Sequence, residues 1–224
     1  MVDHLNKKQI RSFVRREGRI THGQQHALES FWPRFGIEFN HQAINFNAAF
    51  ERTAPCVLEI GFGNGATLAQ AAADNQDLNF LGIEVHKPGI GHLLQLLDKH
   101  ALTNVRIICH DAVEVLQNAP ATGFFRQISV FFPDPWPKKR HHKRRLIQPD
   151  FAALLASLLE ENGVLHVATD WADYAGHITN VMASQALLQR APLHAALPRP
   201  TTRFEVKGKN RGHAVFDLVY IKPA

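Results

Sequence analysis

The sequence predicts an α/β fold built on an open sheet, and two observations carry this prediction. Val57, Leu58 and Ile60 form a short apolar run, which three glycines separate from a helical stretch and a second apolar run at 80–83. Strand, glycine turn, helix and strand in this order are typical of a βαβ unit. Apolar runs then alternate with helical stretches to about residue 188, which predicts a sheet covered by helices.

The glycine turn of this unit suits a nucleoside ligand. Gly61, Gly63 and Gly65 have no Cβ, so the backbone can turn tightly there and approach a ligand closely. Glu84 follows the second strand, where a carboxylate can accept hydrogen bonds from both hydroxyls of a ribose. The arrangement therefore predicts a site for an adenosine-containing cofactor. The alternative is an ordinary strand-to-helix turn that binds nothing.

Glu59 distinguishes between two cofactors that the glycine pattern allows. The spacing of Gly61, Gly63 and Ala66 also satisfies the dinucleotide fingerprint. A dehydrogenase strand would bury an apolar residue at position 59, and a carboxylate there would repel a pyrophosphate. The ammonium and sulfonium groups of S-adenosylmethionine would instead be attracted to it. Glu59 therefore favours S-adenosylmethionine over a nicotinamide dinucleotide.

Acids follow or end several of the predicted strands. Glu59, Glu84 and Asp111 lie at the ends of the first three strands, and Asp170 follows a later strand at 164–169. Ligands of open α/β sheets bind outside the carboxyl ends of the strands, so we expect the first three acids to line one crevice. Asp111 also begins a predicted helix as its N-cap, a role that is compatible with ligand binding.

A proline-rich loop follows the fourth predicted strand, at 127–132. Three prolines within 133–137 frame Asp134 and Trp136. Proline holds the backbone extended and lacks an N–H donor, so this loop excludes a helix or a central strand. We expect it to present Asp134 to the site. Trp136 is expected either to stack on a splayed base or to be buried as a structural side chain.

A basic run follows this loop directly. Six permanent cations occupy the eight positions 138–145, with no acid among them. Such runs are usually solvated faces, but this one adjoins the predicted ligand edge, which favours phosphate binding. The N-terminal part also carries a basic arm, which either binds nucleic acid or is a solvated tail; its cations are Lys7, Lys8, Arg11, Arg15, Arg16 and Arg19.

The remaining segments set the domain organisation. Residues 1–50 lack the βαβ rhythm and are expected to form a basic N-terminal extension, with one short helix at 24–31 that ends before Pro33. Residues 51–224 are expected to form the catalytic domain. At its carboxyl end, 191–200 is predicted to be a linking loop, and strands at 204–206 and 215–221 are predicted to form an antiparallel hairpin.

Bulk composition excludes several classes of protein. The chain has 224 residues, 25 Lys and Arg against 20 Asp and Glu, and a formal net charge of +5, so a polyanionic partner fits. Two cysteines are too few for a structural zinc site or a disulfide framework. No apolar segment is long enough for a signal peptide or a membrane span. These features predict a cytoplasmic protein that contacts no membrane.

With these motifs in hand, the chain resembles the bacterial tRNA (guanine-N7-)-methyltransferase family over nearly its whole length, including the arm at 15–21. The glycine turn is shared by many methyltransferases. The segment 132–136 with its basic tail, and the tetrad Thr202-Arg203-Phe204-Glu205, are much more specific. The chain departs from the family pattern before Thr202, where the segment is short and rich in Ala and Pro. Arg203 stands where Lys is also common, and the two differ in donor geometry.

The resemblance implies a Rossmann-like class I methyltransferase fold: a seven-stranded mixed sheet with helices on both faces and an antiparallel C-terminal hairpin. It implies transfer of a methyl group from S-adenosylmethionine to N7 of the guanosine numbered 46 in the variable loop of tRNA, with S-adenosylhomocysteine as product. It implies no metal and no obligate protein partner.

The resemblance also implies the roles of individual residues. Asp134 is the catalytic candidate, because a carboxylate stabilises the positive charge that develops on the purine. The residues implied for cofactor binding are Glu59, Gly61, Gly63, Gly65, Glu84, Asp111 and Asp134. Those implied for substrate binding are Lys138, Asp170, Thr202, Arg203, Phe204 and Glu205. Contacts to RNA phosphates are expected from Arg140, Lys143, Arg144 and Arg145.

Three other functions stay open at this point. The same cofactor could serve a methyltransferase that acts on another RNA, a protein or a small molecule. A nicotinamide oxidoreductase is a second alternative, although no second mononucleotide-binding half is evident after the fourth strand. The third is an RNA-binding module that does not catalyse a reaction.

Overall fold

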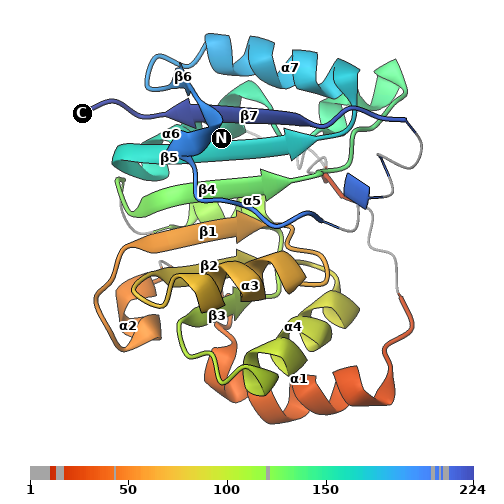
Figure 1. The fold of residues 1–224 in the computed structure, drawn as a ribbon, viewed down its shortest axis with the longest axis vertical. Coiled ribbons are helices and arrows are strands. Elements are labelled where there is room, and N and C mark those ends of the chain that lie inside the picture. Colours follow the sequence, from red (N-terminus) through yellow and green to blue (C-terminus); the bar gives the residue numbers. More distant parts are fainter. Residues whose placement is uncertain are drawn as a thin grey trace, which may run out of the picture.

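Seven strands form one mixed sheet in the order β3-β2-β1-β4-β5-β7-β6 (Figure 1). In chain order the strands are β1 (Cys56–Ile60), β2 (Asn79–Ile83), β3 (Val105–Ile108), β4 (Phe125–Phe131), β5 (Leu159–Thr169), β6 (Gln189–Ala191) and β7 (Phe216–Ile221). The structure is a computed structural model and describes residues 11–13, 18–42, 44–119, 122–202, 205–206, 208 and 212–224.

Five neighbouring strands, β3, β2, β1, β4 and β5, are parallel to one another. β7 runs antiparallel to β5 and to β6, which confirms the predicted mixed sheet with an antiparallel C-terminal hairpin. Because the five parallel strands point the same way, their carboxyl ends lie at one edge of the sheet. The loops that carry the predicted site residues therefore start from this edge.

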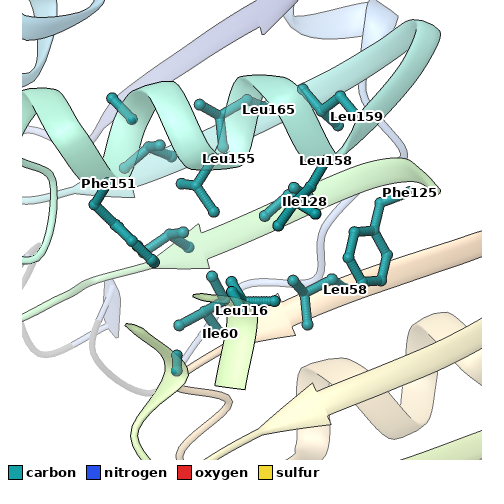
Figure 2. Packing of buried hydrophobic residues seen from close by; sticks show 14 of the residues in the cluster. Leu58, Ile60, Leu116, Phe125, Ile128, Phe151, Leu155, Leu158, Leu159 and Leu165 are labelled. Atoms are coloured by element: carbon teal, nitrogen blue, oxygen red, sulfur yellow. The ribbon is translucent and has the colours of Figure 1, made fainter. Parts of the chain in front are cut away.

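Helices cover both faces of the sheet, because side chains of a strand alternate between its faces. In β1, Val57 packs into a core with α1 (His22–Phe35), α3 (Ala66–Asp74) and α4 (Lys87–Lys99). Leu58 and Ile60 pack into a second core on the opposite face (Figure 2). The helices of that face are α2 (Phe46–Phe50), α5 (Ala112–Gln117), α6 (Pro149–Leu158) and α7 (Ala172–Ala183).

On the α3 face, the part of the sheet near β5 and β7 is covered by an irregular segment (Figure 1). This segment follows β6, includes the short 3₁₀ helix η2 (Leu193–Ala195) and continues to Pro200. Ala196 packs against Val164 and Val219, and the Leu197 N–H donates to the Gln127 Oε1 at 2.8 Å. The segment predicted as a linking loop is therefore a cover for the sheet.

The hairpin does not use the first strand predicted for it. The strand that pairs with β7 in the hairpin is β6. Glu205, Val206 and Gly208 lie instead in a helical turn. The Oγ1 of Thr202 accepts a hydrogen bond from the Glu205 N–H at 3.0 Å, and this cap favours a turn of helix over an extended strand. The predicted strand at 204–206 was wrong for this reason. Residues 203, 204, 207 and 209–211 lie outside the described chain.

α1 also differs from its prediction, because it continues through Pro33 to Phe35. Thr21 caps its start in a capping box with Gln24. Proline in a helix removes one backbone hydrogen bond, but the last turn of α1 buries Phe35 almost completely. This packing outweighs the lost bond.

Residues 22–42 and 44–50 pack on the sheet domain. α1 lies against α4, and the Ile37 N–H donates to the Ile107 carbonyl of β3 at 2.8 Å. Ile44, Phe46 and Phe50 belong to the core shared with α5. We propose to place the boundary between the basic extension and the domain before α1, rather than at residue 50. Among the described helices, none has the length and apolar character that a membrane span requires.

Candidate active site

The glycine turn after β1 has the conformation that the sequence predicts. Gly61, Gly63 and Gly65 have φ values of 72°, 61° and 73°, a region that side chains rarely adopt. A Cβ on Gly61 or Gly63 would meet nothing within 4 Å, whereas one on Gly65 would lie 2.5 Å from Leu93. The first two glycines therefore border open space, and the third allows α3 to pack on α4. Sequence reasoning missed Gly89, whose Cβ would lie 1.9 Å from the Gly63 carbonyl oxygen.

Glu84 connects the end of β2 to the glycine turn. Its carboxylate accepts hydrogen bonds from the Gly63 N–H at 2.9 Å, from the Val85 N–H at 2.6 Å and from the His86 N–H at 2.9 Å. These three donors hold the carboxylate in a fixed position, with 9% of the residue exposed. Glu84 thus places a rigid negative charge beside the open side of the turn.

Glu59 lies near the end of β1 and is buried, with 6% of its surface exposed. Burial, together with the nearby charge of Glu84, raises the pKa of Glu59 to about 8. Glu59 lines a narrow cleft with Thr67 of α3, Ser129 of β4 and the segment 197–200. A buried acid beside a second carboxylate favours a cationic ligand, because a positive charge stabilises both groups.

Asp111 is the N-cap of α5, as predicted. Its Oδ1 accepts from the Val113 N–H at 2.9 Å. Burial raises the pKa of Asp111, and the charge of Arg11 from the N-terminal arm acts in the opposite direction. Asp111 follows the end of β3 by three residues, at the same sheet edge as Glu84, whose N–H donates to the Ile108 carbonyl.

The proline loop after β4 leaves Asp134 exposed. The loop has no regular secondary structure between 133 and 137, as predicted, and Phe132 and Trp136 have positive φ values of 53° and 46°. The Trp136 Nε1–H donates to the Ser12 carbonyl at 3.0 Å, and the Arg144 guanidinium lies over its ring at 4.6 Å. Trp136 is thus half-buried between the segment of Ser12 and the basic run. It is neither fully buried as a structural side chain nor fully open for stacking on a base.

The basic run forms a 3₁₀ helix, η1 (Lys139–Arg144), beside this loop. Lys138, Arg140 and Lys143 are exposed, and Arg144 is half-buried. Arg145 contradicts its prediction as a phosphate contact, because its side chain is only 1% exposed.

The partners of Arg145 explain its burial. It donates to the Pro135 carbonyl at 3.0 Å and to the Asp173 carboxylate, and it lies over the Tyr174 ring at 4.9 Å. Arg145 therefore supports the proline loop from behind, and the exposed cations of the run are the ones that can reach a phosphate.

Three of the predicted substrate residues, Asp170, Thr202 and Glu205, lie on two segments. Asp170 follows β5 and contacts the His213 Nδ1 at 3.2 Å, while a Cβ on Gly208 would lie 2.8 Å from its Oδ2. Thr202 caps the helical turn that carries Glu205, and Glu205 is buried with 6% exposed. Arg203 and Phe204 lie outside the described residues.

Two groups of polar side chains were not predicted. His41, His110 and Glu114 bring their potential metal-ligand atoms within 4.8 Å of one another near the end of β3. Arg199 binds the carboxylates of Glu205 and Asp217. The sequence offered one signal for the second group, since Arg199 is a lone cation between two prolines.

Solved structures define the class to which this fold belongs. The 16S rRNA methyltransferase KamB matches with a TM-score of 0.57 and 16% identity, over 85% of this chain and 99% of KamB. Phosphoethanolamine N-methyltransferase 2 of Haemonchus contortus, solved with S-adenosylhomocysteine, matches with a TM-score of 0.52 and 12% identity, over 90% of this chain and 58% of that one. The chain has the fold of the class I S-adenosylmethionine-dependent methyltransferases.

Sequence relatives narrow the class to a family. A family model described as "Putative methyltransferase" matches residues 53–218. The tRNA (guanine-N(7)-)-methyltransferase of Alkalilimnicola ehrlichii is 50% identical over 96% of this chain and 94% of that protein. The tRNA (guanine-N(7)-)-methyltransferase of Shewanella amazonensis is 48% identical over 97% of this chain and 94% of that protein. The chain belongs to the tRNA (guanine-N7-)-methyltransferase family.

Proposed function

We propose that this chain transfers a methyl group from S-adenosylmethionine to N7 of guanosine 46 in the variable loop of tRNA. The observation that carries the proposal is the arrangement of Glu59, Glu84 and Asp111 at the ends of adjacent strands, beside a glycine turn that borders open space. The names of the relatives, which match this chain over almost its whole length, support the same reaction.

The residues of the crevice fit a cationic nucleoside cofactor. Gly61 and Gly63 leave free the volume that side chains would occupy, so a ligand can approach the backbone. We assign Glu84 to the ribose, Asp111 to the base, and Glu59 to the positive charge of the methionine part. When bound, S-adenosylmethionine supplies a methyl group activated by its sulfonium.

The protein's contribution to the chemistry is orientation and charge stabilisation. Guanine N7 carries a free lone pair, so no residue has to remove a proton before the transfer. Fixed alignment of two reactants can offset roughly 7–11 kcal/mol of a barrier. Asp134 is exposed on a loop whose backbone three prolines restrict, and its carboxylate stabilises the positive charge that develops on the purine.

Recognition of the base is assigned to the acids around this loop. A carboxylate can accept hydrogen bonds from guanine N1–H and N2–H₂, an edge that adenine lacks. Asp134, Asp170 and Glu205 are the candidates, and Lys138 and Thr202 belong to the same proposed surface. Arg203 and Phe204 are proposed for it on the resemblance alone.

Binding of the tRNA backbone is assigned to the exposed cations of the basic run. Lys138, Arg140 and Lys143 are exposed, and Arg144 is half-exposed above Trp136. Contacts of this kind are independent of sequence and depend steeply on salt. Since tRNA is the proposed substrate, the cytoplasm is the proposed location.

A labelling experiment tests the substrate class. Purified protein is incubated with S-adenosylmethionine labelled in its methyl group, together with unmodified tRNA and a bacterial protein extract. We expect label in the tRNA fraction alone, and none when Asp134→Ala replaces the wild type, although this variant should still bind tRNA. Label in protein, or normal turnover by the variant, would refute the respective assignment.

A further inference from the structure

Arg199 joins segments that are far apart in the sequence. Its Nε and Nη2 donate to the two carboxylate oxygens of Asp217 in β7, at 2.8 and 2.9 Å. Its Nη1 donates to the Glu205 Oε2 at 2.5 Å. The three side chains are 10%, 21% and 7% exposed, so water screens these contacts only weakly. One planar guanidinium thus fixes the carboxylate of Glu205 relative to the sheet.

The Asp217 end of this network is anchored inside the domain. His166 of β5 is fully buried, and its Nε2 lies 2.8 Å from the Asp217 Oδ1. Burial acts to raise the pKa of Asp217, but the hydrogen bonds from His166 and Arg199 outweigh it and hold the pKa well below the ordinary value. Asp217 therefore stays ionised and accepts from β5 and from Arg199 together.

The faces of the Arg199 guanidinium touch the strand that leads to the proposed catalytic loop. Its Cζ lies 5.6 Å from the ring centres of Phe131 and Phe132. Phe132 is followed by Pro133 and Asp134, so Arg199 contacts the base of the loop that carries Asp134. The same side chain therefore binds Glu205 and packs against the base of the loop that carries Asp134.

We propose that Arg199 is a positioning residue, which holds the Glu205 carboxylate where it can bind the guanine edge; this inference rests on the proposed function. Glu205 lies on a helical turn of which Thr202 is the cap, and the turn is not part of the sheet. A hydrogen bond to a base needs its acceptor fixed in direction, and Arg199 supplies that restraint. Its positive charge also separates two carboxylates that would otherwise repel each other.

Loss of Arg199 should act locally, because the covering segment has other attachments. The Leu197 N–H binds Gln127 in β4, and Ala196 packs on β5 and β7. Farther along, His213 contacts Asp170 at the end of β5. The segment therefore keeps its course across the sheet without Arg199, while the Glu205 carboxylate loses the guanidinium that links it to Asp217 of β7.

The first test measures order in this turn without any substrate. In Arg199→Gln, hydrogen exchange at the Val206 amide, which donates to the Thr202 carbonyl at 3.1 Å, should be faster than in wild type. Arg190→Gln is the matched control, because Arg190 also contacts Asp217, through the backbone oxygen at 3.2 Å, but does not contact Glu205 through any described hydrogen bond. Unchanged exchange in Arg199→Gln would overturn the proposal whether or not tRNA is the substrate.

The second test is a double-mutant cycle on the methylation of tRNA. Arg199→Gln should lower kcat by about ten- to a hundredfold, since small misplacements of an orienting group have effects of this size, and leave KM for tRNA unchanged. Arg199→Lys should also be impaired, because the single ammonium of lysine cannot reproduce the planar set of donors with which the guanidinium binds Asp217 and Glu205. Arg190→Gln should behave as wild type.

The cycle separates positioning from a merely structural role. If Arg199 acts through Glu205, the double variant Arg199→Gln with Glu205→Gln should be no slower than Glu205→Gln alone. Multiplied losses would overturn the proposal. A wild-type protein that transfers no methyl group to tRNA would refute the proposed function instead, and the exchange experiment would still decide whether Arg199 positions the turn.

Discussion

Replacing Glu59 with glutamine should make the stability of the ligand-free protein less dependent on pH. Burial and Glu84 raise the pKa of Glu59 from 4.5 to about 8 in the folded protein. Between these values the unfolded chain has lost this proton while the folded protein keeps it. The folded state then binds more protons, so its stability falls as pH rises. The amide that replaces the carboxyl group in Glu59→Gln cannot ionise, and this part of the pH dependence disappears.

The size of the effect follows from the shift. Within this window, each pH unit lowers the free energy of unfolding of the wild type by about 1.4 kcal/mol relative to that of the variant. From pH 5 to pH 7 the difference should therefore reach about 3 kcal/mol as an upper value. For a domain of this size, that corresponds to roughly 6–12 °C in Tm. A constant change in stability caused by the buried amide does not affect how the difference between the two proteins varies with pH.

The assay is thermal or urea unfolding of wild type and Glu59→Gln at pH 5, 6 and 7, without cofactor. Glu161→Gln, at an exposed position of β5, controls for the loss of one negative charge and should follow the wild type. Stability curves of wild type and Glu59→Gln that stay parallel over this range would refute the reasoning, because Glu59 would then ionise alike in the folded and unfolded chain. The variant should also bind S-adenosylmethionine more weakly at pH 8.

Three further changes test other parts of the site. Neutralising Arg140 and Lys143 together should weaken tRNA binding and reduce the slope of log K against log salt by about 2, measured by filter binding at several salt concentrations. Arg145→Ala should leave that slope unchanged and instead lower the free energy of unfolding by about 1–3 kcal/mol, seen in urea titrations, because its charged hydrogen bonds are lost. Gly89→Ala should force the Gly63 carbonyl to move, at a cost of about 1–3 kcal/mol, and raise the Kd of S-adenosylmethionine in calorimetric titration.

Hydrophobic periodicity was sufficient to predict the five parallel strands and the edge at which their carboxyl ends meet. Val57, Leu58 and Ile60 form a strand buried on both faces, and a parallel sheet requires that its carboxyl ends share one edge. The glycine turn was predictable because positive φ values at these positions favour glycine. The N-cap role of Asp111 follows from purely local chemistry and was confirmed.

Features that depend on distant partners were not predictable from local patterns. Arg145 looks like its neighbours in the basic run, and contacts with distant residues, such as Asp173, which lies 28 residues away, turn it inward. Arg199 is likewise explained by Asp217, on a strand that the sequence places 18 residues later. The alternation around 204–206 suggested a strand, but the cap from Thr202 favours a helical turn.

The most direct test of the whole account is to locate the methylated nucleotide. Unmodified tRNA is incubated with the protein and S-adenosylmethionine, and the product is cleaved at N7-methylguanosine, whose glycosidic bond is labile. The account predicts one new cleavage, at guanosine 46, which is absent when Asp134→Ala is used. Cleavage at another position, or methylation that leaves the glycosidic bonds stable, would contradict it.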